Sequence, residues 1–330
     1  MLEAMLRAEL GDDVLEGDPT VQRLERAYAE WVGKEGALYL PSGTMANQIA
    51  VGAWTHPGDE LVAERSAHVL QWEAGAVAAL HGVQAQTLDS PDGRLDPDEI
   101  VRAIRYDSLH CPRTKLVCVE QTFMGDGSGP GGRVVPLAHL ERVAAVARAH
   151  GLALHMDGAR LPNAVVASGV PAARFAGCAD SVMSSVSKGL GAPVGAVLAG
   201  PAGFLERARI LRKRFGGWMR QAGVIAAGGL YGLEHHLARL ADDHRLARAV
   251  AEVCQRFEGL CAWPREVESN IVMVKVERPG WTPERLTQAL AAEGVLTLPM
   301  SRTSVRFVTH FDVGAADVER LEGALARVLG

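Results

Sequence analysis

The chain has 330 residues, 48% of them hydrophobic and 22% charged, a composition typical of a globular protein with about two domains. Lysine and arginine number 34 against 39 aspartates and glutamates, and this net charge of −5 excludes a general attraction to nucleic acid or anionic lipid. The five cysteines form no CxxC pair and no run approaches the about 18 apolar residues of a membrane span, so we expect a cytoplasmic protein with reduced thiols.

Short apolar runs alternate with helical patterns over the first 235 residues. Asp18-Pro19-Thr20 predicts the start of the first long helix, which Gly33 or Gly36 ends. The strands that follow are predicted at Ala37–Leu40, Leu61–Glu64, Val83–Thr87, Lys115–Val119, Leu152–Met156, Ser181–Ser184 and Gly195–Ala199. This alternation predicts an α/β domain with a mostly parallel seven-stranded sheet. The last two strands are joined too tightly for a crossover helix, so one pairing there is expected to be antiparallel.

The pattern changes near residue 236. A long charged helix is predicted over 233–257, followed by a strand at Ile271–Val276, a helix at Pro283–Glu293, a strand at Ser304–Thr309 and a terminal helix. We therefore predict a large domain over residues 1–235 and a small C-terminal α+β domain over residues 236–330.

Three segments that contain glycine carry polar side chains. The first, Pro41-Ser42-Gly43-Thr44, joins a predicted strand to the helix that begins near Met45. Hydroxyl groups and free backbone N–H groups at a helix N-terminus can bind a phosphate. Taken alone, the segment more often indicates an ordinary Ser/Thr N-cap.

The second segment, Leu154 to Arg160, places Asp157 at the carboxyl end of a buried strand, where α/β sheets bind ligands. A buried carboxylate is expected to meet a cation. His155 and Asp157 point to the same face of the strand, but no third ligand has suitable spacing, so a hydrogen-bonded pair is favoured over a metal site.

The third segment, Ser184 to Gly191, holds a single lysine, Lys188, among small hydroxyls and glycines. A desolvated lysine has a lowered pKa and can form a Schiff base, although a loop lysine alone is more often a surface residue. In combination, a phosphate-binding turn, the strand-end Asp157 and Lys188 are what pyridoxal 5′-phosphate (PLP) requires.

Gly127 to Gly132 also matches the dinucleotide-binding pattern G-x-G-x-x-G, with Asp157 at the end of the next strand. Three residues separate the last glycine from the helix that should hold a pyrophosphate, and Pro130 removes one N–H donor. A nicotinamide cofactor is therefore the weaker interpretation.

At the level of motifs, the sequence resembles the L-threonine aldolases, PLP enzymes of fold type I. The matching segments begin near Met1, follow the family order and continue almost to the C-terminus. They include Gly11-Asp12-Asp13, Pro41-Ser42-Gly43-Thr44, Glu73-Ala74-Gly75, Pro112-Arg113-Thr114, Asp157-Gly158-Ala159-Arg160, Ser187-Lys188-Gly189-Leu190, Ala192-Pro193-Val194-Gly195, Met219-Arg220-Gln221 and Val305-Arg306-Phe307-Val308-Thr309-His310.

The resemblance implies roles for individual residues. Lys188 would bind the PLP aldehyde, Asp157 would pair with the pyridine nitrogen, and His68 would stack on the ring. Arg220 would approach the phosphate from a partner subunit of a homodimer or homotetramer with active sites at the dimer interface. The residues expected to bind the cofactor are Ser42, Gly43, Thr44, His68, Asp157, Arg160, Ser187, Lys188 and Arg220.

The resemblance also implies the reaction. The enzyme would cleave L-threonine, L-allo-threonine and related β-hydroxy-α-amino acids to glycine and an aldehyde. Arg160 and Arg306 would hold the substrate carboxylate, because a guanidinium can bind a carboxylate through two hydrogen bonds. His68 is the first candidate for the base at the β-hydroxyl, because histidine titrates near neutrality. A β-eliminating lyase, an aminotransferase or a PLP-binding relative with impaired activity are the alternatives.

The sequence departs from the family pattern in three places. The family has a leading Arg-Ser-Asp-Thr segment whose serine helps hold the carboxylate, so either the true start lies upstream of Met1 or the two arginines act alone. Phe123 stands where the family has a histidine, and Trp218 stands where it has a glycine. We expect these rings to make the pocket more apolar and to favour larger substrates such as phenylserine.

Overall fold

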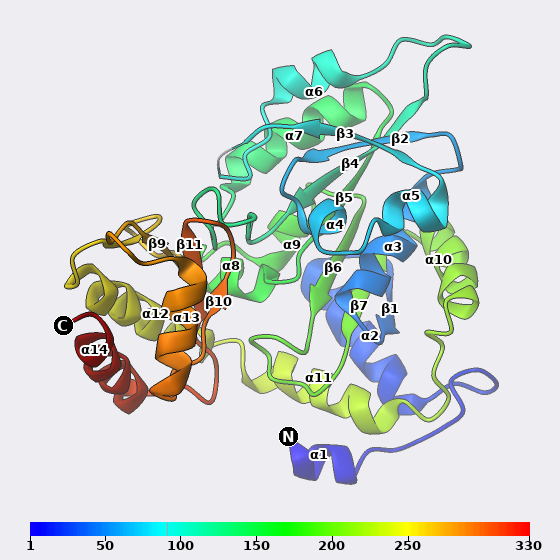
Figure 1. Cartoon of the computed structure of the whole chain (residues 1–330). Coiled ribbons are helices and arrows are strands. Elements are labelled where there is room, and N and C mark those ends of the chain that lie inside the picture. Colours follow the sequence, from blue (N-terminus) through cyan, green and yellow to red (C-terminus); the bar gives the residue numbers. More distant parts are fainter. Residues whose placement is uncertain (91) are drawn as a thin grey trace.

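The computed structural model describes residues 1–90 and 92–330 and contains two β-sheets (Figure 1). The first sheet has seven strands in the order β1-β7-β6-β5-β4-β2-β3. Its strands are β1 (Gly36–Leu40), β2 (Glu60–Glu64), β3 (Gln84–Leu88), β4 (Thr114–Glu120), β5 (Ala153–Asp157), β6 (Ser181–Ser185) and β7 (Ala196–Gly200). The pairings from β6 through β5, β4 and β2 to β3 are parallel, whereas β7 pairs antiparallel with β6 and β1. The predicted sheet, with its antiparallel pairing between the last two strands, is confirmed.

Helices cover both faces of this sheet, because its strands are apolar on both sides. Alternate strand residues such as Tyr39 and Val62 pack into a cluster with α2, α7 and α11. Their neighbours Leu38 and Leu61 lie in two other apolar clusters, which α3, α5 and α10 help to build. The helices of this part are α1 (Leu2–Leu6), α2 (Pro19–Val32), α3 (Gly43–Trp54), α4 (His68–Gln71), α5 (Ala76–His81), α6 (Pro97–Ala103), α7 (Leu137–Ala149), α8 (Leu161–Ser168), α9 (Ala172–Ala176), α10 (Ala202–Arg214) and α11 (Gly223–His235).

The predicted N-cap of α2 is confirmed. The buried Asp18 carboxylate accepts hydrogen bonds from the backbone N–H groups of Thr20 and Val21, both at 3.0 Å. Its second oxygen accepts from the N–H of Gly223 at 3.0 Å, and α11 begins at that residue. The helix ends at Gly33, whose φ of 66° is favourable for glycine. Asp18 therefore joins the starts of α2 and α11.

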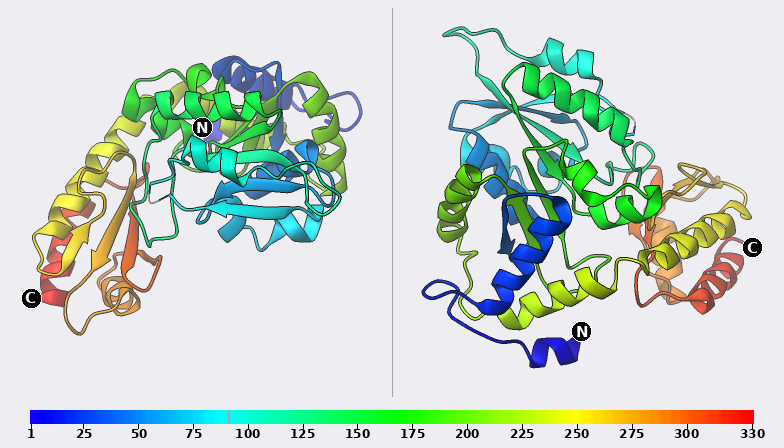
Figure 2. Two further views of the ribbon diagram at one scale, coloured as in Figure 1. Left: turned by 90° about the horizontal axis from the view of Figure 1, so that it is seen from above. Right: turned by 180° about the vertical axis from the view of Figure 1, so that it is seen from behind.

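The second sheet has four antiparallel strands in the order β10-β11-β9-β8. Figures 1 and 2 show it with its helices as a smaller lobe beside the seven-stranded sheet. Its elements are α12 (Leu240–Gln255), β8 (Leu260–Ala262), β9 (Ile271–Val276), α13 (Pro283–Ala292), β10 (Leu298–Pro299), β11 (Ser304–Val308) and α14 (Ala315–Leu329). The lobe has its own apolar cluster, while the domain boundary after residue 235 stays a prediction. Among the described residues, no helix is both long and apolar enough to cross a bilayer.

The long helix predicted over 233–257 is two helices in the structure. α11 ends at His235 and α12 begins at Leu240. His236 caps α11, and its Nδ1 forms a hydrogen bond with the carbonyl oxygen of Leu190 at 2.8 Å. This bond holds the segment between the two helices against the loop that follows Lys188. No glycine or proline marks the break, so helical periodicity alone predicted a continuous helix.

Candidate active site

Several of the predicted site residues follow the carboxyl ends of neighbouring strands in the large sheet. Asp157 ends β5, and Glu120 ends β4 directly opposite it. Lys188 lies in the loop after β6, and His68 begins α4 shortly after β2. Because parallel strands end at the same edge, residues far apart in sequence come together there.

Lys188 lines a cavity of about 300 Å³ between the two lobes. The large lobe contributes Arg160, Ser187 and Lys188, as predicted. The small lobe contributes Asn270, the last residue of β11, Val308, and three residues that follow this strand, His310, Phe311 and Asp312. Burial lowers the pKa of Lys188 to about 8, and the nearby Arg160 lowers it too, against the opposing effects of Asp157 and Glu120. The amine is therefore neutral in a substantial fraction of molecules near physiological pH.

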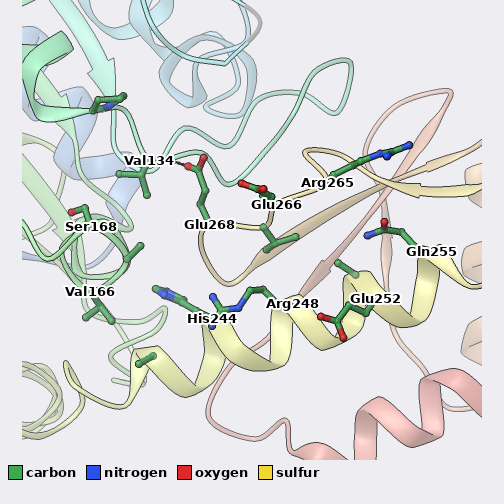
Figure 3. A pocket seen from close by; sticks show the side chains of 15 residues that line it. Val134, Val166, Ser168, His244, Arg248, Glu252, Gln255, Arg265, Glu266 and Glu268 are labelled. Atoms are coloured by element: carbon green, nitrogen blue, oxygen red, sulfur yellow. Dashed lines mark hydrogen bonds between the residues drawn. The ribbon is translucent and has the colours of Figure 1, made fainter.

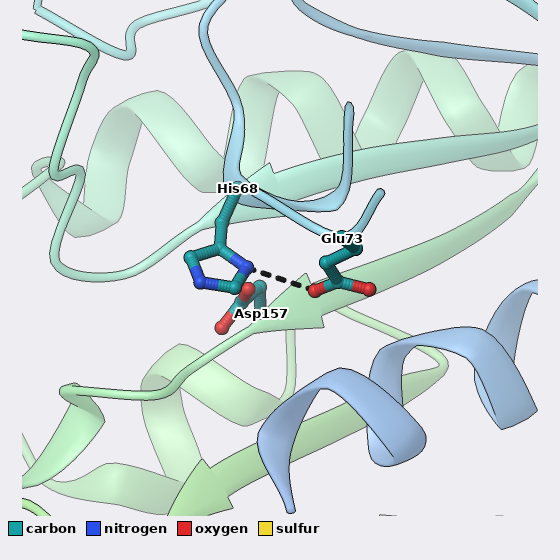
Figure 4. A group of neighbouring side chains, drawn as sticks. All are labelled: His68, Glu73 and Asp157. Atoms are coloured by element: carbon teal, nitrogen blue, oxygen red, sulfur yellow. Dashed lines mark hydrogen bonds and ion pairs between the residues drawn. The ribbon is translucent and has the colours of Figure 1, made fainter. Parts of the chain in front are cut away.

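His68, Glu73 and Asp157 form a compact group at the strand ends (Figure 4). One nitrogen or oxygen atom from each lies within 4.8 Å of the others. His68 Nδ1 lies 2.8 Å from Glu73 Oε1. Asn47 joins the two carboxylates, because its Nδ2 donates to Glu73 Oε1 and to Asp157 Oδ2, each at 2.7 Å. These hydrogen bonds account for the close approach of the three side chains.

Glu73 fixes the orientation of the His68 ring. The carboxylate is buried and also accepts a hydrogen bond from Gln48 Nε2 at 2.6 Å. Burial alone would lower the pKa of His68, but the hydrogen bond with Glu73 and the charges of Asp157 and Glu120 raise it above its ordinary value. With Nδ1 engaged by Glu73, Nε2 is the ring nitrogen left for proton transfer.

Glu120 is a second buried carboxyl group beside this cluster. Its two oxygens accept the backbone N–H groups of His68 and Met124 at 3.1 and 3.0 Å. Burial, followed by the charge of Asp157, raises the pKa of Glu120 to about 7. This carboxyl group therefore changes protonation near neutrality.

Arg160 and Arg306 bring two guanidinium groups to the same region. Arg160 begins α8 after the Asp157 loop, and Arg306 lies on β11 of the small lobe. Burial and then the charge of Arg306 lower the pKa of Arg160 to about 10, and burial also lowers the pKa of Arg306. The Nε atoms of both are buried and lack a hydrogen-bond partner among the described residues. Such a pair suits an anion that supplies the missing acceptors.

The predicted phosphate-binding segment forms the N-terminus of α3. Ser42 is the N-cap and accepts the backbone N–H of Met45 at 3.2 Å. Gly43 packs closely on β6, because a Cβ there would come within 2.8 Å of Met183 Cε. Ser42 and Thr44 are exposed, so their hydroxyls are open to a ligand.

Arg220 lies away from the Lys188 cavity in the single chain. It is 60% exposed and pairs with Asp12 Oδ2 at 2.7 Å. Trp218 lies beside it, donates its indole N–H to Asp13 and stacks under Arg212, whose Cζ lies 4.4 Å from the ring centroid. Neither residue is among the described residues that line the cavity.

Phe123 is buried and occupies a different place from the one expected. A Cβ on Gly93 would lie 2.4 Å from Phe123 Cγ, so the ring fills space over that glycine. The residue that contacts Arg306 is the next one, Met124, whose Sδ lies 3.0 Å from Arg306 Nη1. Met124 belongs to an apolar cluster with Ile271, Met273 and Met300.

The glycine-rich loop Gly127 to Gly132 binds the small lobe. The Gly127 carbonyl oxygen accepts hydrogen bonds from Ser301 and Ser304, at 3.0 and 2.7 Å, and the Gly132 carbonyl oxygen accepts one from Ser269 at 2.8 Å. α7 begins only at Leu137, so the loop does not open directly into a helix. The structure thus accounts for these glycines without a dinucleotide.

A larger cavity, of about 910 Å³, lies along α12 and the segment before β9, between the lobes (Figure 3). His244 and Arg248 line it from α12, and Glu266 and Glu268 line it from the segment before β9. None of its lining residues is a lysine. Lys188 and Arg160, which were predicted from the sequence, line the smaller cavity.

Sequence reasoning gave no role to Asn47, Glu73 or Glu120. Glu73 does stand in a segment that matches the family pattern, so its position was visible in the sequence but its contacts were not. Asn47 lies on α3, five residues after the N-cap Ser42, and nothing in the local pattern marks it.

The comparisons with known proteins agree with this geometry. The family model described as β-eliminating lyase matches residues 1–279. The Arabidopsis thaliana protein named "Probable low-specificity L-threonine aldolase 2" is 42% identical over 97% of this chain and 90% of its own length. The low specificity L-threonine aldolase of Escherichia coli K12 is 40% identical over 95% of this chain and 90% of its own length. A solved Leishmania major threonine aldolase has a TM-score of 0.82 and 22% identity, and the match covers 100% of this chain and 95% of that chain.

Proposed function

The chain belongs to the β-eliminating lyase family, in its threonine aldolase group, and on that premise we propose that it cleaves L-threonine to glycine and acetaldehyde with PLP. The observation that carries this proposal is the placement of Lys188 and Arg160 in one cavity, close enough to Asp157 for its charge to act on both cations. L-allo-threonine and related β-hydroxy-α-amino acids are substrates of the same kind.

The residues present fit PLP. A lysine with a lowered pKa can bind an aldehyde, and a carboxylate at the strand end can hold a proton on a pyridine nitrogen. The exposed hydroxyls at the N-terminus of α3 suit a phosphate group. When bound, PLP supplies the electron sink for cleavage of the bond between Cα and Cβ.

The protein residues have distinct tasks in this proposal. Arg160 and Arg306 bind the substrate carboxylate, which supplies the acceptors that their Nε atoms lack. His68 stacks on the cofactor ring, and its Nε2 accepts the proton of the β-hydroxyl group, while Glu73 holds Nδ1. Glu120 is a second candidate for proton transfer because its pKa is about 7.

Replacing Lys188 tests the proposed function. With PLP and L-threonine, the wild-type chain is expected to release glycine and acetaldehyde, and Lys188→Ala to lose about a thousandfold or more of that activity. Borohydride treatment followed by mass spectrometry is expected to find the cofactor on Lys188. Lys34→Ala is the control, because burial also lowers the pKa of Lys34. A cofactor adduct that persists in Lys188→Ala, or release of pyruvate or a keto acid instead of glycine, would contradict the proposal.

We also propose a preference for bulky substrates such as phenylserine. Phe123 and Trp218 do not line the cavity, and what supports the preference is the methionine-rich cluster of Met124 beside Arg306. The ratio of kcat/KM for L-phenylserine over L-threonine is expected to exceed about tenfold, the order expected when several more carbons are buried. A higher kcat/KM for threonine would show that this pocket does not select a bulky side chain.

We further propose a cytoplasmic homodimer or homotetramer in which Arg220 serves the partner's site. Arg220 is exposed and does not line the cavity of its own chain, which supports this assignment, and the five free cysteines suit a reducing compartment.

Subunit mixing tests the shared site. Lys188→Ala and Arg220→Ala are each expected to be inactive alone. Refolded as an equal mixture, half of the dimers are mixed and each has one intact site, so about a quarter of wild-type activity should return. A mixture that stays inactive while forming mixed dimers would place Arg220 in the site of its own chain.

A further inference from the structure

A continuous line of buried hydrogen bonds runs behind the carboxylates of the site. Trp54 Nε1 donates to Ser181 Oγ at 2.9 Å, and Ser181 Oγ lies 2.9 Å from His155 Nδ1. His155 Nε2 then lies 3.1 Å from Asn47 Oδ1. Ser181, His155 and Asn47 are each at most 1% exposed, so water does not complete their hydrogen bonds.

The line ends on two carboxylates of the site. The Asn47 amide nitrogen donates one hydrogen bond to Glu73 and one to Asp157, each with a nitrogen–oxygen distance of 2.7 Å. Asp157 is held at its other oxygen as well, because Oδ1 accepts the backbone N–H of Ala159 at 3.0 Å. The Asn47 amide therefore connects Glu73, which bonds His68, with Asp157, which is expected to pair with the cofactor's ring nitrogen.

The chemistry of the two ends fixes the direction of the bonds that involve Trp54 and Asn47. An indole N–H can only donate, and a carboxylate can only accept. Asn47 must turn its NH₂ toward the carboxylates, so its Oδ1 must accept from His155 Nε2. In a neutral His155 ring, Nδ1 then accepts from the Ser181 hydroxyl, whose oxygen accepts from Trp54.

This arrangement requires a neutral His155 with its proton on Nε2. Burial lowers the pKa of His155 to about 4, against the opposing charge of Asp157, so the neutral form prevails at neutral pH. A flipped Asn47 amide would point its oxygen at two carboxylates and leave the proton of His155 facing an NH₂ group. His155 and the two carboxylates therefore favour the same orientation of Asn47.

We propose that His155 and Asn47 are positioning residues that hold Asp157 and Glu73 in the geometry required to bind PLP. The inference rests on the proposed function. Neither residue is expected to touch the substrate, and His155 acts only through Asn47. Removing outer-shell partners of metal ligands typically changes affinity about 10- to 100-fold, and we expect an effect of the same order for these partners of Asp157 and Glu73.

The test measures the dissociation constant of PLP with the full chain, in the absence of any amino acid. His155→Leu and Asn47→Leu are each expected to weaken PLP binding about tenfold or more. His155→Gln, which can keep an N–H donor toward Asn47, is expected to bind within about threefold of wild type. Ser181→Ala removes a single hydroxyl and is expected to weaken binding about threefold, which provides a milder variant if the leucine variants fold poorly.

A double variant separates positioning from a general structural effect. Because His155 acts through Asn47, His155→Leu is expected to add no further loss of PLP affinity in the Asn47→Leu background. His139→Leu is the matched control. His139 is a buried histidine on α7 whose ring nitrogens bond the Leu95 carbonyl and Arg142, and neither bond involves a carboxylate of the site. Its replacement is expected to leave PLP affinity unchanged.

Four results would overturn the inference. One is wild-type PLP affinity in folded His155→Leu and Asn47→Leu while the enzyme still cleaves threonine, which leaves the proposed function intact. A second is a loss of PLP affinity in the double variant that equals the product of the two single losses. A third is a loss of PLP affinity in His139→Leu as large as that in His155→Leu. A wild-type chain that binds no PLP would overturn the proposed function together with this inference.

Discussion

The proximity of Lys188 to Arg160 in a partly desolvated cavity is the constraint on which the rest of the site depends. Burial penalises the charged form of both groups, and the charge of Arg160 adds to the cost of keeping Lys188 charged. The amine can lose its proton, whereas a guanidinium keeps it. Burial and this repulsion together therefore produce a lysine that is ready to react with an aldehyde, while Arg160 remains available for an anion.

The carboxylates at the strand ends limit how far the pKa of Lys188 falls. Asp157 and Glu120 oppose the lowering of the Lys188 pKa, and Asp157 in turn raises the pKa of Glu120. The fold brings these groups together because β4 and β5 are parallel and end at the same edge. The small lobe completes the set, because Arg306 comes from β11 and the cavity is lined from both lobes.

The sequence was sufficient to predict the parts that depend on strand ends. Asp157 and Lys188 follow apolar strands, and parallel pairing then places both at the ligand-binding edge. Asn47 and Glu73 could not be found this way, because their pairing depends on how α3 packs across the sheet onto the segment after α4. Phe123 and Met124 show the same limit. The motif shows that Phe123 replaces the family's histidine. Which side chain contacts Arg306 depends on the path of the backbone, and that side chain is Met124.

The most direct test of this account is the pKa of the Lys188 amine in the chain without PLP. The rate of PLP adduct formation is measured across pH, because the neutral amine is the form that attacks the aldehyde. The rate is expected to rise with pH and to reach half its limit at about 8, since the amine loses its proton there. A midpoint near the ~10.4 of an ordinary lysine would show that neither burial nor Arg160 activates Lys188.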